Sequence, residues 1–446
     1  MILHAKIHKI CKLMPNFARQ NQYFFMKNLF QSLILPLLGL FLPLFAVADE
    51  ALDTLSNGQQ TADNRQRTTD DGQQTTDDGQ LSPKALRLLF DADAFIVDNE
   101  FDGPMAKGYT LPGTWIAPRL AYDPHPAVHL EAGLYAIFFN GADRYPSYAF
   151  HDIASWKGAQ YRKGIHALPW FRADARIGQA TFTLGTLHRE SALHGTPAVH
   201  GLALPLSNPE SLHSADPEMG AQVRLALPRY DLDLWIDWQS FIYRQDTHQE
   251  AFTAGLVQEV GLFSSARRNV SLTLPIQILT QHRGGEIDAT HCGAQTLANA
   301  ALGLRAQWLP DRRILTGLGA EAMVLHSMQL KGTLWPQNSG DALWAQASAL
   351  LWNRLDVRGG YLFGYHYVSL FGTPHLSTFS TVSGRQYGHV NTATYRVAYR
   401  QPFSHDMSLT ASVDGFLAHP SGEPFSHSLS LALCFRAGLD FLLKRF

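Results

Sequence analysis

The sequence predicts an all-β fold: a single transmembrane antiparallel up-and-down β-barrel of about sixteen strands, within a range of roughly fourteen to eighteen. Three observations support this prediction. Apolar and polar residues alternate with a period of two through most of the chain after residue 85. No stretch there approaches the ~18 consecutive apolar residues of a membrane-spanning helix. The connections between the alternating segments are short and long in turn.

The composition excludes several other classes of protein. The chain has 446 residues, of which 46% are hydrophobic, 17% charged and 11% aromatic, with a mean hydropathy of −0.12. The charged content is low for soluble domains, the mean hydropathy is too low for a bundle of membrane helices, and the aromatic content is too high for a disordered protein. Residues 1–48 carry five basic and no acidic residues, which leaves a charge of −7 on the rest. A basic footprint for nucleic acid is therefore absent.

Residues 1–48 have the features of an export signal. A positive start at Met26 precedes an apolar run over 29–45, and a small-residue cleavage site closes it at Ala48. This pattern predicts a signal peptide that is cleaved after Ala48. A retained membrane anchor is the alternative, against which two prolines within the run argue. Translation could start at Met1 or at Met26.

Residues 49–84 form a polar linker of low complexity. The hexapeptide Thr-Thr-Asp-Asp-Gly-Gln occurs at 68–73 and again at 75–80, and such short adjacent copies predict a disordered segment rather than a folded repeat. Two cysteines, Cys292 and Cys434, follow the leader. Two cysteines so far apart in the sequence do not make a disulfide framework. The predicted domains are the leader and signal peptide 1–48, the linker 49–84 and the barrel 85–446.

About sixteen segments of the barrel region alternate like strands with two different faces. In 230–238, four apolar residues share one face, while three aspartates and Trp235 share the other. Each segment covers roughly nine to thirteen residues, the length of a tilted strand that crosses a bilayer. Their approximate centres are Phe90, Arg119, Gly133, Arg172, Leu184, Arg224, Ile236, Leu256, Leu274, Leu304, Ala320, Ala347, Tyr361, Val397, Val413 and Leu433.

The connections between these segments indicate how the barrel is oriented. Tight connections are expected at 123–127, 178–179, 228–229, 310–312, 353–354 and 402–406, and long ones at 97–112, 140–166, 189–218, 282–296, 327–340 and 368–391. Outer-membrane barrels have this pattern, with short periplasmic turns and long outer loops. The alternation calls for long loops near 244–250 and 419–427 as well, but these two connections look short.

Charged residues on the polar face of the strands predict a polar lumen of mixed charge, because a lipid-facing Arg near the bilayer midplane costs about 2–4 kcal/mol. Such side chains select solutes by charge and pore diameter. The candidates are Arg119, Glu131, Arg172, Asp174, Arg176, Arg224, Asp233 and Arg305. The loop 140–166 adds Tyr145, Trp156 and Tyr161, whose rings could grip a sugar-like solute in the pore or pack within a surface loop.

Several motifs resemble those of a known group of proteins. They lie at 97–104, 107–113, 145–146, 156–158, 249–252 and 281–288. On these motifs the sequence is similar to uncharacterised porin-like outer-membrane β-barrel proteins of Gram-negative bacteria, those of the Bacteroidota in particular. The resemblance implies the fold and the outer-membrane location, and no activity. The terminal Phe446 resembles the signal that such barrels present to the barrel-assembly machinery, although Lys444 departs from the usual apolar residue.

Three other clusters could be read as catalytic or metal-binding sites. The segment 188–194 holds two His and one Glu, but it lacks the spacing of a zinc motif, and a solvated loop explains it better. Asp246, His248 and Glu250 could converge on a cation or form a charged rim of the barrel. The glycines at 284–285 suit a sharp turn, beside charges that suit rim salt bridges.

The leading hypothesis is a porin-like channel for small polar solutes such as sugars, with selectivity set by the charge-mixed lumen and the 140–166 loop. One alternative is a barrel enzyme that acts on lipid or peptide through His188, Ser191 or Asp246–Glu250. The other is a plugged barrel that serves in surface binding or adhesion. No catalytic residue, metal or cofactor is predicted. The expected partners are outer-membrane lipids, the barrel-assembly machinery and the solute, and a homo-oligomer is left open.

Overall fold

The computed structural model describes residues 84–140, 164–193, 196–244, 246, 248–285, 287, 293–404 and 406–446. The predicted leader 1–48, nearly all of the predicted linker 49–84 and residues 141–163 lie outside this described part of the chain. The described residues all belong to one compact unit.

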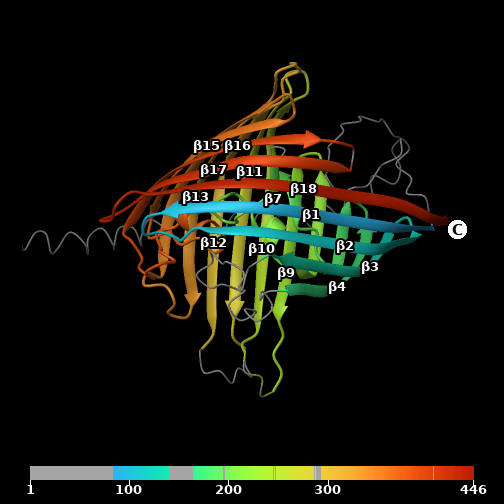
Figure 1. The fold of residues 1–446 in the computed structure, drawn as a ribbon, viewed down its shortest axis with the longest axis horizontal. Coiled ribbons are helices and arrows are strands. Elements are labelled where there is room, and N and C mark those ends of the chain that lie inside the picture. The colour runs from blue at the N-terminus through green and yellow to red at the C-terminus, as the bar shows by residue number, and fades with distance from the viewer. Residues whose placement is uncertain are drawn as a thin grey trace, which may run out of the picture. The chain divides into compact units, whose positions relative to one another are not determined.

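Sixteen strands close into one antiparallel barrel, which confirms the predicted fold class (Figure 1). Every strand pairs with the next barrel strand along the chain, and β1 pairs with β18 to close the ring. The barrel strands are β1 (Ala85–Asp102), β2 (Tyr109–His125), β3 (Val128–Phe139), β4 (Gly164–Ile177), β5 (Ala180–Thr186), β8 (Met219–Leu227), β9 (Tyr230–Ser240), β10 (Ala251–Ser265), β11 (Val270–Arg283), β12 (Gln295–Trp308), β13 (Leu315–Lys331), β14 (Ser339–Leu351), β15 (Leu355–Tyr365), β16 (His389–Pro402), β17 (Met407–Pro420) and β18 (Ser426–Arg445).

The outward face of the barrel is apolar, as the alternation predicts. In β9, Trp235 faces inward and is 3% exposed, whereas the outward-facing Leu234 and Trp238 are 46% and 45% exposed. Within lipid every backbone polar group needs a partner in the protein, so a sheet can present such a face to a membrane only as a closed barrel. The protein is therefore an outer-membrane β-barrel.

All sixteen predicted strand centres fall inside observed strands, but the strand lengths differ from the prediction. They run from 7 residues in β5 to 20 in β18. Ladder hydrogen bonds continue through polar residues beyond the apolar band, so several outer loops are shorter than the sequence indicates. The connection predicted at 97–112, for example, is confined to 103–108.

The predicted tight turn at 353–354 is confirmed, one residue earlier than expected. Trp352 and Asn353 both have positive φ, at 54° and 55°, and the Arg354 amide donates to the Leu351 carbonyl at 2.9 Å. Positive φ at both central residues is the type I′ geometry, whose twist matches that of the flanking strands.

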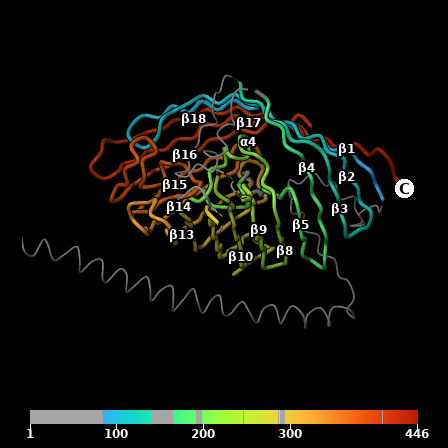
Figure 2. Tube along the Cα trace, turned by 90° about the horizontal axis from the view of Figure 1, so that it is seen from below, coloured from blue at the N-terminus to red at the C-terminus, as the bar shows by residue number. Residues whose placement is uncertain are grey.

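Two of the long loops fold back into the barrel, and we call their described residues together the plug: 187–218, apart from 194–195, and 366–388. The first contains the hairpin β6 (Glu190–Leu193) and β7 (Thr196–Val199), followed by α4 (Ser211–Ser214); the second contains the short turn η3 (Pro374–Leu376). Figure 2 shows α4 within the ring of strands. No helix in the described part of the chain is long and apolar enough to span a membrane.

The two plug segments bind each other as well as the wall. A bridge joins Ser207 to Phe371, and the Pro205 carbonyl accepts hydrogen bonds from Ser369 Oγ at 2.6 Å and from the Tyr367 hydroxyl at 3.2 Å. Both plug segments therefore form one body inside the barrel.

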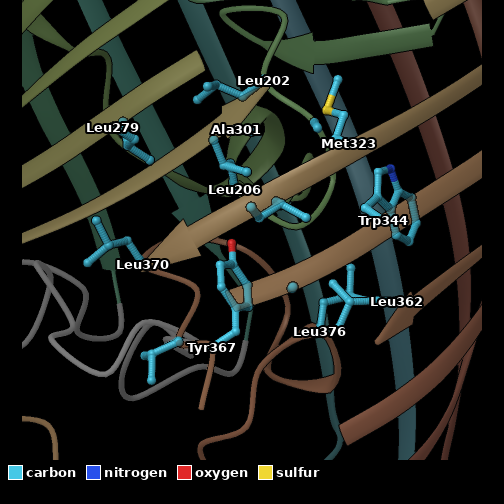
Figure 3. Packing of buried hydrophobic residues seen from close by; sticks show 14 of the residues in the cluster. Leu202, Leu206, Leu279, Ala301, Met323, Trp344, Leu362, Tyr367, Leu370 and Leu376 are labelled. Atoms are coloured by element: carbon cyan, nitrogen blue, oxygen red, sulfur yellow. The ribbon is translucent and has the colours of Figure 1, made fainter. Parts of the chain in front are cut away.

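Plug and wall share a hydrophobic core (Figure 3). Leu206, Tyr367 and Leu376 of the plug are fully buried, and they pack with inward-facing wall residues that include Trp344 and Leu362. This differs from the predicted polar lumen, because in this part of the barrel the inward positions are apolar where they meet the plug. Burial of apolar side chains from both sides fills the space that a wide barrel encloses.

Candidate functional site

Glu131 on β3 is the centre of a charged cluster on the inner wall. Its carboxylate accepts a hydrogen bond from Trp170 Nε1 at 2.7 Å and pairs with Arg119 Nε at 3.1 Å, His129 Nε2 at 3.2 Å and Arg172 Nη1 at 3.5 Å. The Arg119 and Arg172 guanidinium groups lie 4.5 and 5.2 Å from the centroid of the Trp170 ring. Glu131 is 4% exposed, so this cluster satisfies its own charges within the wall.

A second charged cluster joins residues of β10, β12, β13 and β14. Arg305 on β12 donates to Glu321 on β13 at 3.1 Å and also pairs with Glu259 on β10. The second oxygen of Glu321 accepts from Trp344 Nε1 at 2.8 Å. Arg119 and Arg305 were both predicted to face the lumen. Each is buried in one of these clusters and forms ion pairs there.

The other predicted lumen residues have different surroundings. Asp174 binds Thr183 at 2.6 Å and His188 at 3.0 Å, and Asp233 accepts from Gln222 at 2.7 Å. Arg224 is half-buried on β8, and Arg176 is exposed one residue before the end of β4. Tyr145, Trp156 and Tyr161 lie outside the described residues. A role of any of these side chains in selecting a solute stays a prediction.

His200 fastens the first plug segment to the wall. Its ring stacks on Trp235, with centroids 3.8 Å apart and planes 6° apart. Its Nδ1 lies 2.8 Å from Asp233, and its Nε2 lies 2.8 Å from Glu218. Burial opposes the charge on the imidazole, but the two carboxylates outweigh burial and raise the pKa of His200 to about 9.

A row of polar contacts fixes the other side of the plug, and we call it the α4 seam: Glu210, His213 and Asp216 against the inner wall. A helical turn places the N-cap residue Glu210 and His213 on one side of α4, and Asp216 follows just after the helix ends. The Glu210 carboxylate accepts from the Tyr109 hydroxyl at 2.7 Å and from Asn99 Nδ2 at 3.1 Å.

The middle and end of the α4 seam are ion pairs. His213 Nδ1 lies 2.6 Å from Asp93 Oδ2 on β1, and Asp216 Oδ1 lies 3.2 Å from His166 Nε2 on β4. Burial opposes the charge on His213, but the hydrogen bond to Asp93 outweighs it and raises the pKa of His213 to about 10. The seam therefore gathers carboxylates, imidazoles and a phenol, which are the groups of acid–base chemistry.

Comparison with known proteins assigns the family. The model of the lipid A 3′-O-deacylase-type family matches residues 75–446, most of the chain. The chain belongs to this family. The match spans the whole barrel, including both plug segments and every residue of the α4 seam. No curated protein matches the chain.

Several solved structures are similar to this member of the lipid A 3′-O-deacylase-type family. OccAB4 of Acinetobacter baumannii is 9% identical, covers 81% of this chain and 99% of its own, and has a TM-score of 0.45. OccK1 (OpdK) of Pseudomonas aeruginosa is 10% identical over 80% and 99%, with a TM-score of 0.44. A BenF-like porin from Pseudomonas fluorescens is 9% identical over 81% and 100%, with a TM-score of 0.43.

The catalytic alternative drawn from the sequence does not form one cluster in this family member. His188 pairs with Asp174 on the inner wall, whereas His248 contacts the Phe241 carbonyl at 2.9 Å and lies 4.0 Å from Asp246 in the connection between β9 and β10. Within the described ranges, no three His, Cys, Asp or Glu side chains are placed to hold a metal ion.

Sequence reasoning missed the α4 seam. Glu210 and His213 lie in a connection with no periodic pattern, and their wall partners are more than a hundred residues away in the chain. Asp93 did not stand out in the sequence, because Asp91 lies on the same face of β1 two residues earlier.

Removing the Glu131 carboxylate should destabilise the barrel strongly. Glu131→Ala leaves two buried guanidinium groups without their shared partner, and we expect a loss of about 3–5 kcal/mol in the free energy of unfolding. The measurement is the urea midpoint of the folded band on a gel. Glu423→Ala is the control: its partner Arg385 is 61% exposed, so its effect should stay within about 1 kcal/mol. Equal midpoints for the two variants would contradict the cluster's role.

Raising the pH should loosen the first plug segment. The pKa of His200 is raised from 6.5 to about 9, so its ion pairs stabilise the plug fully below pH 6.5 and lose that contribution as the pH rises through 9. We expect proteolysis within 187–218 to quicken across this window. His200→Gln should remove that dependence, and an unchanged profile in this variant would argue against the ion pairs as its cause.

Proposed function

We propose that this protein is an outer-membrane hydrolase that cleaves an acyl ester of a glycolipid of the lipid A class. The name of its family supplies the substrate class. The α4 seam is the observation that carries the proposal, because it brings acid–base side chains together on the inner wall.

The buried residues of the inner wall favour catalysis at a fixed site over conduction through an open pore. Every barrel strand contributes at least one buried side chain, and those of Trp235, Val257, Met323, Trp344 and Leu362 pack in one cluster with the plug. An open aqueous lumen would leave such positions exposed to water. One buried residue from each strand in chain order is Asp93, Leu111, Tyr135, Arg172, Thr183, Gln222, Trp235, Val257, Gln277, Asn299, Met323, Trp344, Leu362, Thr392, Ala418 and Ser428.

The seam has the groups that ester hydrolysis requires. A hydrolase needs a base that takes a proton from the attacking group and an acid that returns it to the leaving oxygen. Asp93 fixes the charged His213 ring through Nδ1, so Nε2 can act as the acid. The Glu210 carboxylate, three residues earlier in the chain, can act as the base.

The test is release of fatty acid from lipid A by the purified barrel in lipid vesicles, followed by mass spectrometry. We expect release by the native protein and a loss of roughly 100-fold or more in His213→Gln, the range seen when a general acid–base group is removed. His326→Gln is the matched control, because His326 also pairs with an aspartate, Asp341 at 2.8 Å, and is exposed to the same 24%.

His326→Gln should release fatty acid at the native rate. Folded native barrel that releases none, or a His213→Gln variant as active as the control, would overturn the proposal.

A selective porin-like channel is the second candidate, and the mixed charges of the inner wall favour it. Conduction would require the plug to move, since its core contacts fill the barrel beside it. Selectivity for small polar solutes such as sugars would then come from the charged wall and the 140–166 loop. Discrete ohmic steps from the native barrel in a planar bilayer would favour the channel. A silent bilayer with folded protein would reject it.

A further inference from the structure

One imidazole of the α4 seam joins a thiol to a carboxylate. His213 Nε2 lies 3.7 Å from the Sγ atom of Cys434 on β18, and His213 Nδ1 lies 2.6 Å from Asp93 Oδ2 on β1. The plug supplies the imidazole, and two neighbouring wall strands supply the other two groups. Cys434 is 221 residues from His213 in the chain, so only the folded plug brings the three together.

The surroundings hold this arrangement in place. Asp93 is fully buried and also pairs with Arg436 at 3.2 Å, while the other guanidinium nitrogen of Arg436 binds Glu190 at 2.8 Å. The Phe95 ring packs against His213 with centroids 5.7 Å apart. The orientation of the imidazole is thus fixed from two sides, and Nε2 is directed at the sulfur.

We propose that Cys434 is the nucleophile of an acyl-transfer site, with His213 as its proton carrier and Asp93 as the positioning residue. The substrate class is an oxygen ester of a fatty acid, so this assignment rests on the proposed hydrolase function and names its nucleophile. A thiol paired with an imidazole that a third group orients is the geometry of an activated nucleophile.

The reaction balances without a redox partner. The proton that Cys434 and His213 share starts on His213 Nε2, in keeping with the charged imidazole, and the sulfur forms a bond to the ester carbonyl carbon. The bond from that carbon to the alcohol oxygen then breaks, and His213 gives its proton to this oxygen. Water next attacks the thioester with the now neutral His213 as base, which breaks the bond to sulfur, releases the fatty acid and restores the shared proton to the pair.

The first experiment acylates the thiol with p-nitrophenyl acetate. It uses the full barrel with Cys292→Ser, which leaves Cys434 as the sole cysteine after the predicted cleavage site. We expect a burst of about one nitrophenolate per barrel, and an acetyl group on Cys434 by peptide mass spectrometry. Cys434→Ser preserves the shape of the side chain and should abolish the burst.

The second experiment tests the roles of His213 and Asp93. His213→Gln should slow acylation by roughly 100-fold or more. Asp93→Asn should lower the acylation rate constant at least about tenfold while the half-saturating ester concentration stays unchanged, which a merely structural role would not do. His326→Gln should acylate at the native rate, and the folded gel band shows that each variant retains its barrel.

Two outcomes overturn the assignment: no acetyl group on Cys434, or acylation that is equally fast in His213→Gln. The lipid assay separates the assignment from the proposed function. If Cys434→Ser still releases fatty acid from lipid A, the assignment of Cys434 as the nucleophile is overturned and the proposed hydrolase function is retained. If Cys434 takes the acetyl group with His213 dependence and lipid A is untouched, the acyl-transfer site is supported and the lipid A substrate is overturned.

Discussion

The closing ladder between β1 and β18 is the constraint on which the rest of the structure depends. In a membrane no backbone donor or acceptor is left without a partner, so the first and last strands pair from Ala85–Arg445 to Asp102–His427. Closure over sixteen strands encloses more space than inward side chains alone can fill. The plug follows from this geometry, since it supplies Leu206, Tyr367 and Leu376 to that space.

The plug is held by two kinds of interaction with different consequences. Its apolar contacts contribute a non-directional term that scales with buried area. The ion pairs of His200 and His213 instead fix its position and rotation, because a hydrogen-bonded charge tolerates little displacement. A buried pair also costs desolvation, so these pairs favour one arrangement of the plug more than they add to stability.

Much of the fold follows from the sequence alone, and much of the site does not. Alternation with period two reports the two faces of each strand directly, which is why centres such as Phe90 and Leu433 fall inside β1 and β18. The same reasoning gave inward positions to Arg119 and Arg305. It could not find Glu210, His213 or Cys434 as a group, because contacts across a lumen leave no periodic trace. Nor did it find the apolar part of the lumen. Apolar side chains such as Trp235 and Leu362 are stable on the inner wall because the plug covers them, and the sequence pattern does not show the plug.

The order of strands has a consequence for biogenesis. Both plug segments lie in the interior of the sequence, between β5 and β8 and between β15 and β16, whereas the two strands that close the ring are the first and the last. A closed wall cannot admit a folded body of that size from the side. The two plug segments therefore take their place either before the terminal strands meet or through an open end of the ring, and never between two strands of the finished wall.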